Sequence, residues 1–348
     1  MQQLSRQDDL MTTGASSLRD SGAAALEKLL AGAERSRNGL EVEVDGRRLR
    51  LRNLDEVLYP RTGFTKGDLI GWYAAAAPWL LPHLHGRPLT LKRYPSGVQG
   101  RHFYQKQSPA ARPAWVRTAT IWSPYSGREI DYVICEDLPT LIWLANLANI
   151  ELHPSLSLAA AMHRPTALVL DLDPGPPADI VSCCEVALEL RALLDALRLK
   201  SFPKTSGLKG MQLYVPLNTA DATYEATKPL AHELASLLAR ERPTTVVSRM
   251  GKASRAGKVL IDWSQNDAHK TTISVHSLRA FDTPTASTPV RFEEVEACLQ
   301  AKDSRLLTFE AAAALDRLQT HGDLFTGVLS LRQPVPELEA ARSCLAAF

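Results

Sequence analysis

ALVLDLDPGPP, residues Ala167–Pro177, joins a short apolar run to two acids and a turn. The apolar run Leu168–Leu170 predicts a buried β-strand. Asp171 and Asp173 are two residues apart, so in an extended strand both carboxylates point to one face. Pro174-Gly175 then ends the strand and leaves the acids at its mouth. Two carboxylates this close repel each other unless a divalent cation with oxygen ligands neutralises them. The alternative is an ordinary strand end with two solvated acids.

A second apolar run that ends in an acid lies downstream. Val259–Ile261 predicts a strand, and Asp262 follows it directly. Three acids at strand ends can hold two metal ions, and paired ions stabilise both the attacking and the leaving oxygen of an in-line phosphoryl displacement. The repeated arrangement therefore favours a metal site over solvated acids.

The turn SGLKG, Ser206–Gly210, precedes a predicted strand over Met211–Val215. Its two glycines, Gly207 and Gly210, let backbone N–H groups approach an anion closely, and its serine and lysine add a hydroxyl and a cation. The spacing is not that of a Walker A loop, and a strand rather than a helix follows. The turn is a candidate phosphate site, and the alternative is a tight hairpin turn.

Cations are interleaved with aromatic residues in two predicted strands, Arg87–Tyr94 and Arg101–Lys106. Cations can bind phosphates and flat rings can stack on bases, so this pattern suits a nucleic acid. Aromatic residues in strands also form cores, which is the alternative interpretation. Further hydrogen-bond donors are expected in the loops Ser248–Lys258, His269–Thr272 and Ser277–Arg279. An exposed ring is expected in the loop Ser123–Gly127, which Trp122 precedes.

The composition is that of an ordinary soluble globular protein, with 45% hydrophobic and 22% charged residues. The net charge of +2 over 348 residues is nearly balanced, so any nucleic-acid contact would be local. Five cysteines, an odd number without a C-x-x-C pair, favour a reducing cytoplasm. The polar first 20 residues contain no secretory signal. The apolar stretch Leu138–Met162 is too polar to span a bilayer and predicts a buried helix that runs into a loop.

Local signals predict a mixed α/β composition, with apolar strands that end in the acids and with amphipathic helices. A hairpin is expected over Leu40–Arg52, and a helix over Lys66–Leu81 is capped by Thr65 and ended or kinked by Pro78. Further helices are predicted after Asp179 and over Ala222–Glu241, Phe292–Ala301 and Thr308–Gln319. We expect a poorly ordered leader over 1–38 with one short helix at Ala23–Ala33, a catalytic domain over 39–335 and a C-terminal tail over 336–348.

Together these features describe nucleotidyl transfer, with acids for two metal ions, a turn for a triphosphate, and basic and aromatic segments for a template. The same motifs resemble the bacterial archaeo-eukaryotic-primase-type polymerases, which are the polymerase domain of the end-joining DNA ligase D and its stand-alone relatives. The resemblance extends from about Leu40 to Leu331. It is carried, in the family's order, by NLDEVLYP, TGFTKGD, LKRYP, ELHP, DLDPG, TSGLKGMQLYVPL and GKVLIDWSQN followed by KTT and SLRA.

The resemblance implies a mixed α/β fold, with a sheet core that carries the acids and is flanked by helices. It also implies a DNA-templated primase-polymerase that extends primers, fills short gaps during repair and favours ribonucleotides. Asp171, Asp173 and Asp262 would be the catalytic acids and would hold two Mn²⁺ or Mg²⁺ ions. The residues implied to bind the incoming NTP or dNTP include three for its triphosphate, namely His153, Ser206 and Lys209. The other nucleotide-binding candidates are Lys92, Gly207, Gly210, Gln212, Arg255, Gln265, Lys270 and Arg279.

The resemblance also implies contacts with gapped or primer-template DNA. Phe103 and Tyr104 match an aromatic pair that stacks against the template, and Arg93 is a further DNA-binding candidate. Lys66 matches one of two lysines that grip the 5′-phosphate of the downstream strand. We expect a cytoplasmic monomer without a membrane segment or an attached ligase module, working with a separate DNA ligase or repair factors.

Two positions depart from the family pattern. Glu56 stands where end-joining members typically have the second phosphate-gripping lysine, and an acid there would repel the phosphate at close range. Gln212 stands where many members have histidine, and since both side chains form hydrogen bonds we expect little change.

Three alternatives stay open on the sequence. The first is a dedicated end-joining polymerase that acts at double-strand breaks. The second is a DxD phosphatase of the haloacid-dehalogenase type, which usually has Thr or Val two residues beyond the second Asp, where this chain has Pro174-Gly175. The third is a non-catalytic nucleic-acid-binding module, which would leave three strand-end acids facing a polyanion for no purpose.

Overall fold

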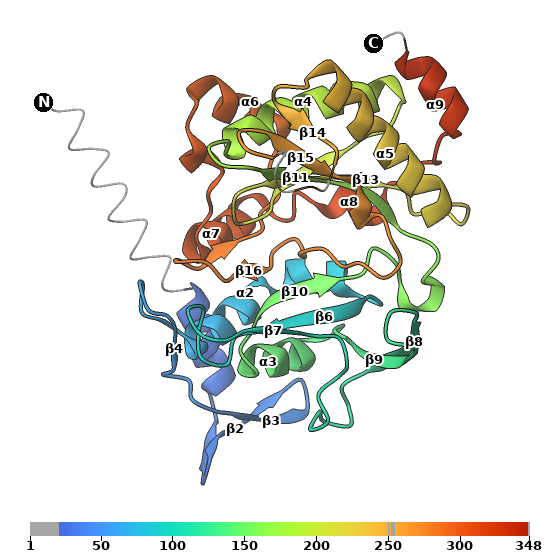
Figure 1. Ribbon diagram of the computed structural model, residues 1–348. Helices are drawn as coiled ribbons and strands as arrows, with labels where there is room; N and C mark the ends of the chain where they lie inside the picture. Colours follow the sequence, from blue (N-terminus) through green and yellow to red (C-terminus); the bar gives the residue numbers. More distant parts are fainter. Residues whose placement is uncertain (1–20, 250, 252–254, 347–348) are drawn as a thin grey trace, which may run out of the picture.

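The computed structural model describes residues 21–249, 251 and 255–346, which form two packed halves (Figure 1). Each half is built on its own sheet, with helices against the sheet face that points away from the other half. This arrangement confirms the predicted mixed α/β fold. None of the helices in the described part of the chain is both long and apolar enough to cross a membrane.

The sheet that carries the acids is called the acid sheet here. Its strand order is β12 (Phe202–Thr205), β13 (Met211–Pro216), β11 (Ala167–Pro174), β15 (Val259–Asp262) and β14 (Val246–Val247). The strands β14 and β15 run parallel, and the other pairs are antiparallel. Along β11, Leu168, Leu170 and Leu172 pack into a core with the helices α4 (Ile180–Ala196) and α5 (Tyr224–Glu241). Because side chains alternate along a strand, Asp171 and Asp173 point to the opposite face.

The opposing sheet lies in the other half. Its strand order is β10 (Asn149–Pro154), β6 (Pro88–Arg93), β9 (Arg128–Ile134) and β8 (Thr118–Ser123), and β7 (Phe103–Gln105) also pairs with β6. Leu89, Leu91 and Leu152 pack into a second core with α2 (Lys66–Leu84) and α3 (Leu138–Asn146). Thr90 and His153 are direct cross-strand partners on the other face, which looks toward the acid sheet.

Shorter elements flank these sheets. The predicted hairpin consists of β2 (Gly39–Val44) and β3 (Arg47–Leu51), with β1 (Glu34–Ser36) added at its edge. The strand β4 (Val57–Tyr59) pairs with β5 (Phe64–Thr65), and β16 (Leu278–Arg279) pairs with β17 (Thr285–Ala286). The remaining elements are α6 (Phe292–Ala301), α7 (Ala311–His321), α8 (Thr326–Ser330), α9 (Leu338–Leu345) and the 3₁₀ turns η1 (Ala159–Ala161), η3 (Trp263–Gln265) and η4 (Ser304–Leu307).

The predicted start of α2 at Lys66 is confirmed, but the helix ends at Leu84 and not at Leu81. The Thr65 side chain accepts a hydrogen bond from the backbone N–H of Asp68, whose carboxylate accepts one from the Thr65 N–H, so a capping box is present. Pro78 does not end the helix, which continues to Leu84. Pro82 is a second proline inside the helix, and each interior proline costs about 3 kcal/mol. The helix continues because Leu80 and Leu84 beyond Pro78 are fully buried, and burying such a side chain contributes about 1.5–3 kcal/mol.

A predicted loop and both ends of the described chain contain regular structure. The loop predicted after α3 is strand β10, because its backbone lies in the interior, where unpaired peptide groups are costly, and pairs with β6. The short helix expected at Ala23–Ala33 corresponds to a helix over residues 21–30, and β1 pairs with β2 within the expected leader; residues 1–20 lie outside the described residues. The expected C-terminal tail contains α9, whose Ala341 and Leu345 are buried against the acid half.

Asn266 completes the backbone hydrogen bonding of β11 with its side chain. The residue is fully buried, and its Oδ1 accepts a hydrogen bond from the Val169 N–H at 2.9 Å. Its Nδ2 donates to the Val169 carbonyl at 2.7 Å and to the Trp263 carbonyl at 2.9 Å. The side chain therefore joins the segment after Asp262 to the strand that carries Asp171.

We predict that Asn266→Ala lowers the free energy of unfolding by about 2–4 kcal/mol, because the buried N–H and carbonyl of Val169 lose their side-chain partner. Urea denaturation measures this change. Asn38→Ala, at an exposed position in the turn between β1 and β2, is the matched control and should cost less than about 0.5 kcal/mol. An Asn266→Ala protein as stable as the control would contradict the assigned role.

Candidate active site

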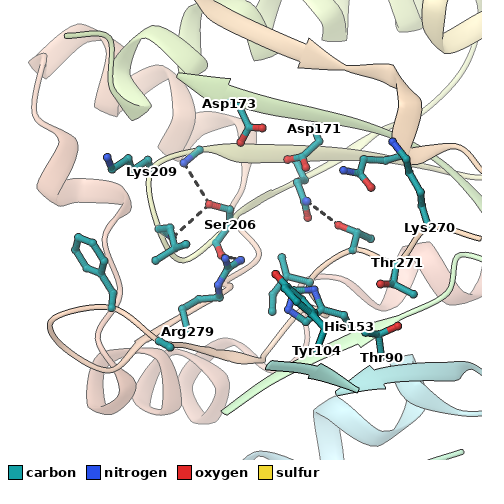
Figure 2. A pocket seen from close by; sticks show the side chains of 18 of the residues that line it. Thr90, Tyr104, His153, Asp171, Asp173, Ser206, Lys209, Lys270, Thr271 and Arg279 are labelled. Atoms are coloured by element: carbon teal, nitrogen blue, oxygen red, sulfur yellow. Dashed lines mark hydrogen bonds between the residues drawn. The ribbon is translucent and has the colours of Figure 1, made fainter. Parts of the chain in front are cut away.

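The register of the acid sheet gathers the three predicted acids on one face. Asp171 is the direct cross-strand partner of both Asp262 and Gln212, and Gln212 is the partner of Lys204. Direct partners share a face, so these four residues form one row across β12, β13, β11 and β15. Asp173 lies on the same face, one pleat further along β11. Figure 2 shows Asp171 and Asp173 pointing into a pocket.

These carboxylates are costly to ionise together. Burial and then the charge of Asp173 raise the pKa of Asp171 to about 7. Burial and then the charge of Asp262 raise the pKa of Asp173. Beside them, the side-chain oxygen of Gln212 is buried without a hydrogen bond from any described residue. Clustered carboxylates and an unpaired amide oxygen are the ligands that Mg²⁺ and Mn²⁺ take, so these residues fit divalent cations.

Asp262 is oriented by residues that follow it. The backbone N–H of Ser264 and the side-chain amide of Gln265 donate to its carboxylate at 2.9 and 3.1 Å. The ammonium group of Lys270 contacts the Ser264 hydroxyl. Two predicted nucleotide-binding residues, Gln265 and Lys270, therefore also support the third acid.

A pocket of about 750 Å³ lies between the two halves, in front of Asp171 and Asp173. It brings together most of the predicted nucleotide-binding residues, namely His153, Ser206, Lys209, Gly210, Gln212, Arg255, Gln265, Lys270 and Arg279, and also Tyr104. The predicted residues outside its lining are Lys66, Lys92, Arg93, Phe103, Gly207 and Asp262. Cations and hydroxyls facing clustered acids suit a polyanion bound beside metal ions.

The turn Ser206–Gly210 is held by side chains as well as by its own backbone. The Ser206 hydroxyl accepts a hydrogen bond from the Gly210 N–H at 3.2 Å, and the Ser206 carbonyl accepts one from Arg279 Nη1 at 3.0 Å. Gly207 has a φ of +74°, and a Cβ there would come within 2.7 Å of Arg279 Cγ. Glycine is therefore required at 207 by packing and by backbone conformation, and Arg279 is anchored to the turn.

Glu151 is a site residue that sequence reasoning missed. It is fully buried, and its carboxylate accepts hydrogen bonds from Lys92 Nζ at 3.2 Å and Tyr94 Oη at 3.2 Å. It also lies 2.9 Å from His153 Nε2 and 3.6 Å from Arg279 Nε. Burial alone would raise the pKa of Glu151, but the His153 hydrogen bond and the charges of Arg279 and Lys92 hold it well below the usual range. Its one sequence signal was its position in ELHP, two residues before His153 and thus on the same strand face.

Lys204 is the second residue that was missed. It is fully buried at the end of the acid row, and its ammonium donates to the Ser287 hydroxyl at 2.7 Å. Burial lowers the pKa of Lys204 to about 7, against the opposing effect of the Asp171 charge. Its cation offsets part of the negative charge of the acids. Its place two residues before Ser206, in KTSGLKG, was the signal that could have found it.

The aromatic pair predicted to stack on a template is split between two faces. Phe103 and Tyr104 are neighbours on β7, so their rings point to opposite sides. Tyr104 lines the pocket, with its ring centroid 5.9 Å from that of His153. Phe103 lies outside the pocket lining, 42% exposed, with the Arg93 guanidinium 5.3 Å from its ring centroid. The two rings thus lie on different sides of β7, both exposed, and their stacking on a template stays a prediction.

Lys66 also lies outside the pocket lining, and it already has an acidic partner. Its side chain is 7% exposed, and its Nζ lies 2.6 Å from Glu56 Oε2. The acid that was expected to oppose phosphate binding thus neutralises this lysine directly.

A separate cluster of His83, His276 and Asp323 brings its possible metal-ligand atoms within 4.8 Å of one another. Asp323 lies 2.8 Å from His83 Nε2 and 3.1 Å from His276 Nε2, and it also accepts a hydrogen bond from the Phe325 N–H at 2.9 Å. The carboxylate thus has its partners within the protein, and we interpret the cluster as a clamp between α2 and the segments around residues 276 and 323.

Comparisons with known proteins point to one family. A family model described as LigD, primase-polymerase domain, matches residues 65–325. The solved structure of the polymerase domain from Mycobacterium tuberculosis Ligase D in complex with DNA matches with a TM-score of 0.75 and 35% sequence identity. That match covers 82% of this chain and 99% of the solved chain.

Two relatives match this chain over part of their own length. It is 39% identical over 279 residues to the multifunctional non-homologous end joining protein LigD of Mycolicibacterium smegmatis, covering 80% of this chain and 35% of that protein. It is 31% identical over 275 residues to the bifunctional non-homologous end joining protein LigD of Bacillus subtilis, covering 79% of this chain and 43% of that protein. The chain thus spans less than half the length of these relatives. The family predicted from the motifs is confirmed: the chain belongs to the LigD primase-polymerase family, whose polymerase domains are nucleotidyltransferases.

Proposed function

We propose that this chain is a DNA-templated nucleotidyltransferase that extends primers and fills short gaps during DNA repair, with a preference for ribonucleotides. The observation that carries the proposal is the row of carboxylates on one sheet face, opposite a pocket rich in cations. Family membership supports polymerisation, and the DNA in the solved M. tuberculosis complex supports a DNA substrate.

Asp171, Asp173 and Asp262 would hold two Mn²⁺ or Mg²⁺ ions. When bound, such a pair of ions stabilises the attacking and the leaving oxygen of an in-line phosphoryl displacement. Ser206 and Lys209 lie at the glycine-containing turn beside the acids (Figure 2), where a hydroxyl and a cation can bind a triphosphate. These groups position the phosphates, so that little side-chain acid–base chemistry is required of the protein.

Exposed rings supply the second part of the proposal, the template contact. Phe103 with Arg93 forms one such surface on β7. Tyr125, at the tip of the hairpin between β8 and β9, is fully exposed, and Trp122 on β8 is 58% exposed. Rings stack on bases regardless of their identity and cations bind the backbone, which suits a single-stranded template.

A second candidate function is end joining at double-strand breaks, which the names of the relatives favour. The pairing of Lys66 with Glu56 weighs against strong capture of a 5′-phosphate, because the phosphate would have to displace a carboxylate 2.6 Å from the ammonium group. We therefore infer gap filling with weak dependence on a 5′-phosphate.

Replacing the two acids of β11 tests the metal assignment. Asp171→Ala with Asp173→Ala should lower single-nucleotide incorporation on a short-gapped duplex by about 1,000-fold or more, because the charge of the triphosphate and of the transition state loses its counterions. Fluorescence anisotropy should show DNA affinity close to that of the wild type. Asp316→Ala, at an exposed position on α7, is the control. Retained incorporation in the double variant would refute the assignment.

Releasing Lys66 from its partner tests the role of Glu56. Glu56→Gln should increase the advantage of a gap that carries a 5′-phosphate over one that lacks it by about 3- to 10-fold, since the lysine becomes available to an anion. Primer extension on the two gaps measures this ratio. Adding Lys66→Met to Glu56→Gln should abolish the gain. Strong phosphate dependence in the wild-type protein would show that Glu56 does not block the lysine.

A further inference from the structure

The hydrogen bond between Glu151 and His153 determines which ring nitrogen carries a proton. Both residues lie on β10, two positions apart and on the same face, and Glu151 Oε2 is 2.9 Å from His153 Nε2. The pKa of Glu151 lies well below the usual range, so its carboxylate is ionised at neutral pH. An ionised carboxylate only accepts hydrogen bonds, so Nε2 of His153 must be the protonated nitrogen.

The other ring nitrogen, Nδ1, is left as an acceptor. Burial is the largest influence on His153 and lowers its pKa, and the charges of Arg279 and Lys92 act in the same direction. Glu151 opposes them, but the pKa remains lowered, so the ring is neutral at neutral pH. A neutral ring with a proton on Nε2 carries a lone pair on Nδ1. Among the described residues, Nδ1 has no hydrogen-bond partner.

The ring of His153 lies where a ligand in the pocket can reach it. His153 lines the pocket from the opposing sheet, and Figure 2 shows it beside Tyr104 on the wall opposite Asp171 and Asp173. Ser206 and Lys209, the groups suited to a triphosphate, lie on the acid sheet instead. A ligand that reaches from that turn across the pocket therefore presents a part other than its phosphates to His153.

The chemistry of a nucleotide narrows what this part can be. Phosphate oxygens at neutral pH are acceptors and cannot donate to Nδ1. Hydroxyl groups of the sugar are donors and are common to all four nucleotides, whereas N–H donors of the bases differ from one base to the next. A templated polymerase must accept every base, so a fixed acceptor in its nucleotide pocket suits a sugar hydroxyl.

We propose that Nδ1 of His153 accepts a hydrogen bond from a hydroxyl of the sugar of the incoming nucleotide, and that Glu151 is the positioning residue that holds the ring in this tautomer. The inference rests on the proposed function and changes the role of His153 from a triphosphate contact to a sugar contact. The hydroxyl is either the 2′- or the 3′-group, and substrates that lack one or the other distinguish the two.

The test measures single-nucleotide incorporation of NTP, 2′-deoxy-NTP and 3′-deoxy-NTP by the wild type and by His153→Gln. Glutamine keeps an N–H donor for Glu151 but has no group at the place of Nδ1. In the wild type, kcat/KM should fall by about 3- to 10-fold for the substrate that lacks the contacted hydroxyl. For His153→Gln, kcat/KM should be the same for that substrate and for the NTP. His163→Gln, exposed and outside the pocket lining, is the matched control and should keep the wild-type discrimination.

The outcomes separate this inference from the proposed function. A wild-type protein that incorporates no nucleotide would overturn both. A wild-type protein that incorporates all three substrates equally well would overturn the sugar contact alone. So would a His153→Gln protein that loses the same factor with every substrate, because a phosphate contact would behave in that way.

The tautomer of His153 gives a readout that does not depend on turnover. NMR of ¹⁵N-labelled histidine in the wild-type protein should show Nε2 protonated and Nδ1 unprotonated at neutral pH. Glu151→Gln should weaken that preference and reduce the discrimination between substrates with and without the hydroxyl. A proton on Nδ1 in the wild-type protein would overturn the inference.

Discussion

Repulsion among carboxylates on one face of a sheet is the constraint on which this structure depends. Strand pleating places Asp171 and Asp173 on the same side of β11, and the antiparallel register adds Asp262 directly opposite Asp171. The acids cannot turn away, because the other face of the sheet is filled by apolar side chains packed against α4 and α5. Carboxylates gathered on one face are stabilised by positive charge, which Lys204 supplies in part and which bound metal ions would complete.

The opposite wall of the pocket requires a negative charge, because the cations Lys92 and Arg279 lie there or directly behind it. Glu151 lies fully buried, offsets the charges of Lys92 and Arg279, and accepts a hydrogen bond from the neutral His153 ring. Arg279 also donates to the Ser206 carbonyl, so one chain of contacts runs from the opposing sheet to the turn of the acid sheet. A single buried carboxylate thus orients Lys92, His153 and Arg279 and links the two halves.

Most of the candidate site was predictable because each motif places several functional residues on one strand or turn. DLDPG, SGLKG and the strand ending at Asp262 all meet in one pocket or at its edge. Glu151 and Lys204 were not found, because a buried charge is recognised by its partners, and those partners come from distant segments. Which side of β7 each ring of the aromatic pair occupies follows from alternation along the strand, which separates Phe103 from Tyr104.

The sequence by itself determined what local backbone geometry controls: which strands end in acids, which residues cap α2 and α4, and the family to which the motifs belong. Tertiary structure decided that α2 continues past Pro78 and that residues after α3 pair as β10. It also decided that Nε2 of His153 lies against Glu151. These outcomes depend on burial and on pairing between residues far apart in the chain, and their energies outweigh local preferences of a few kilocalories per mole.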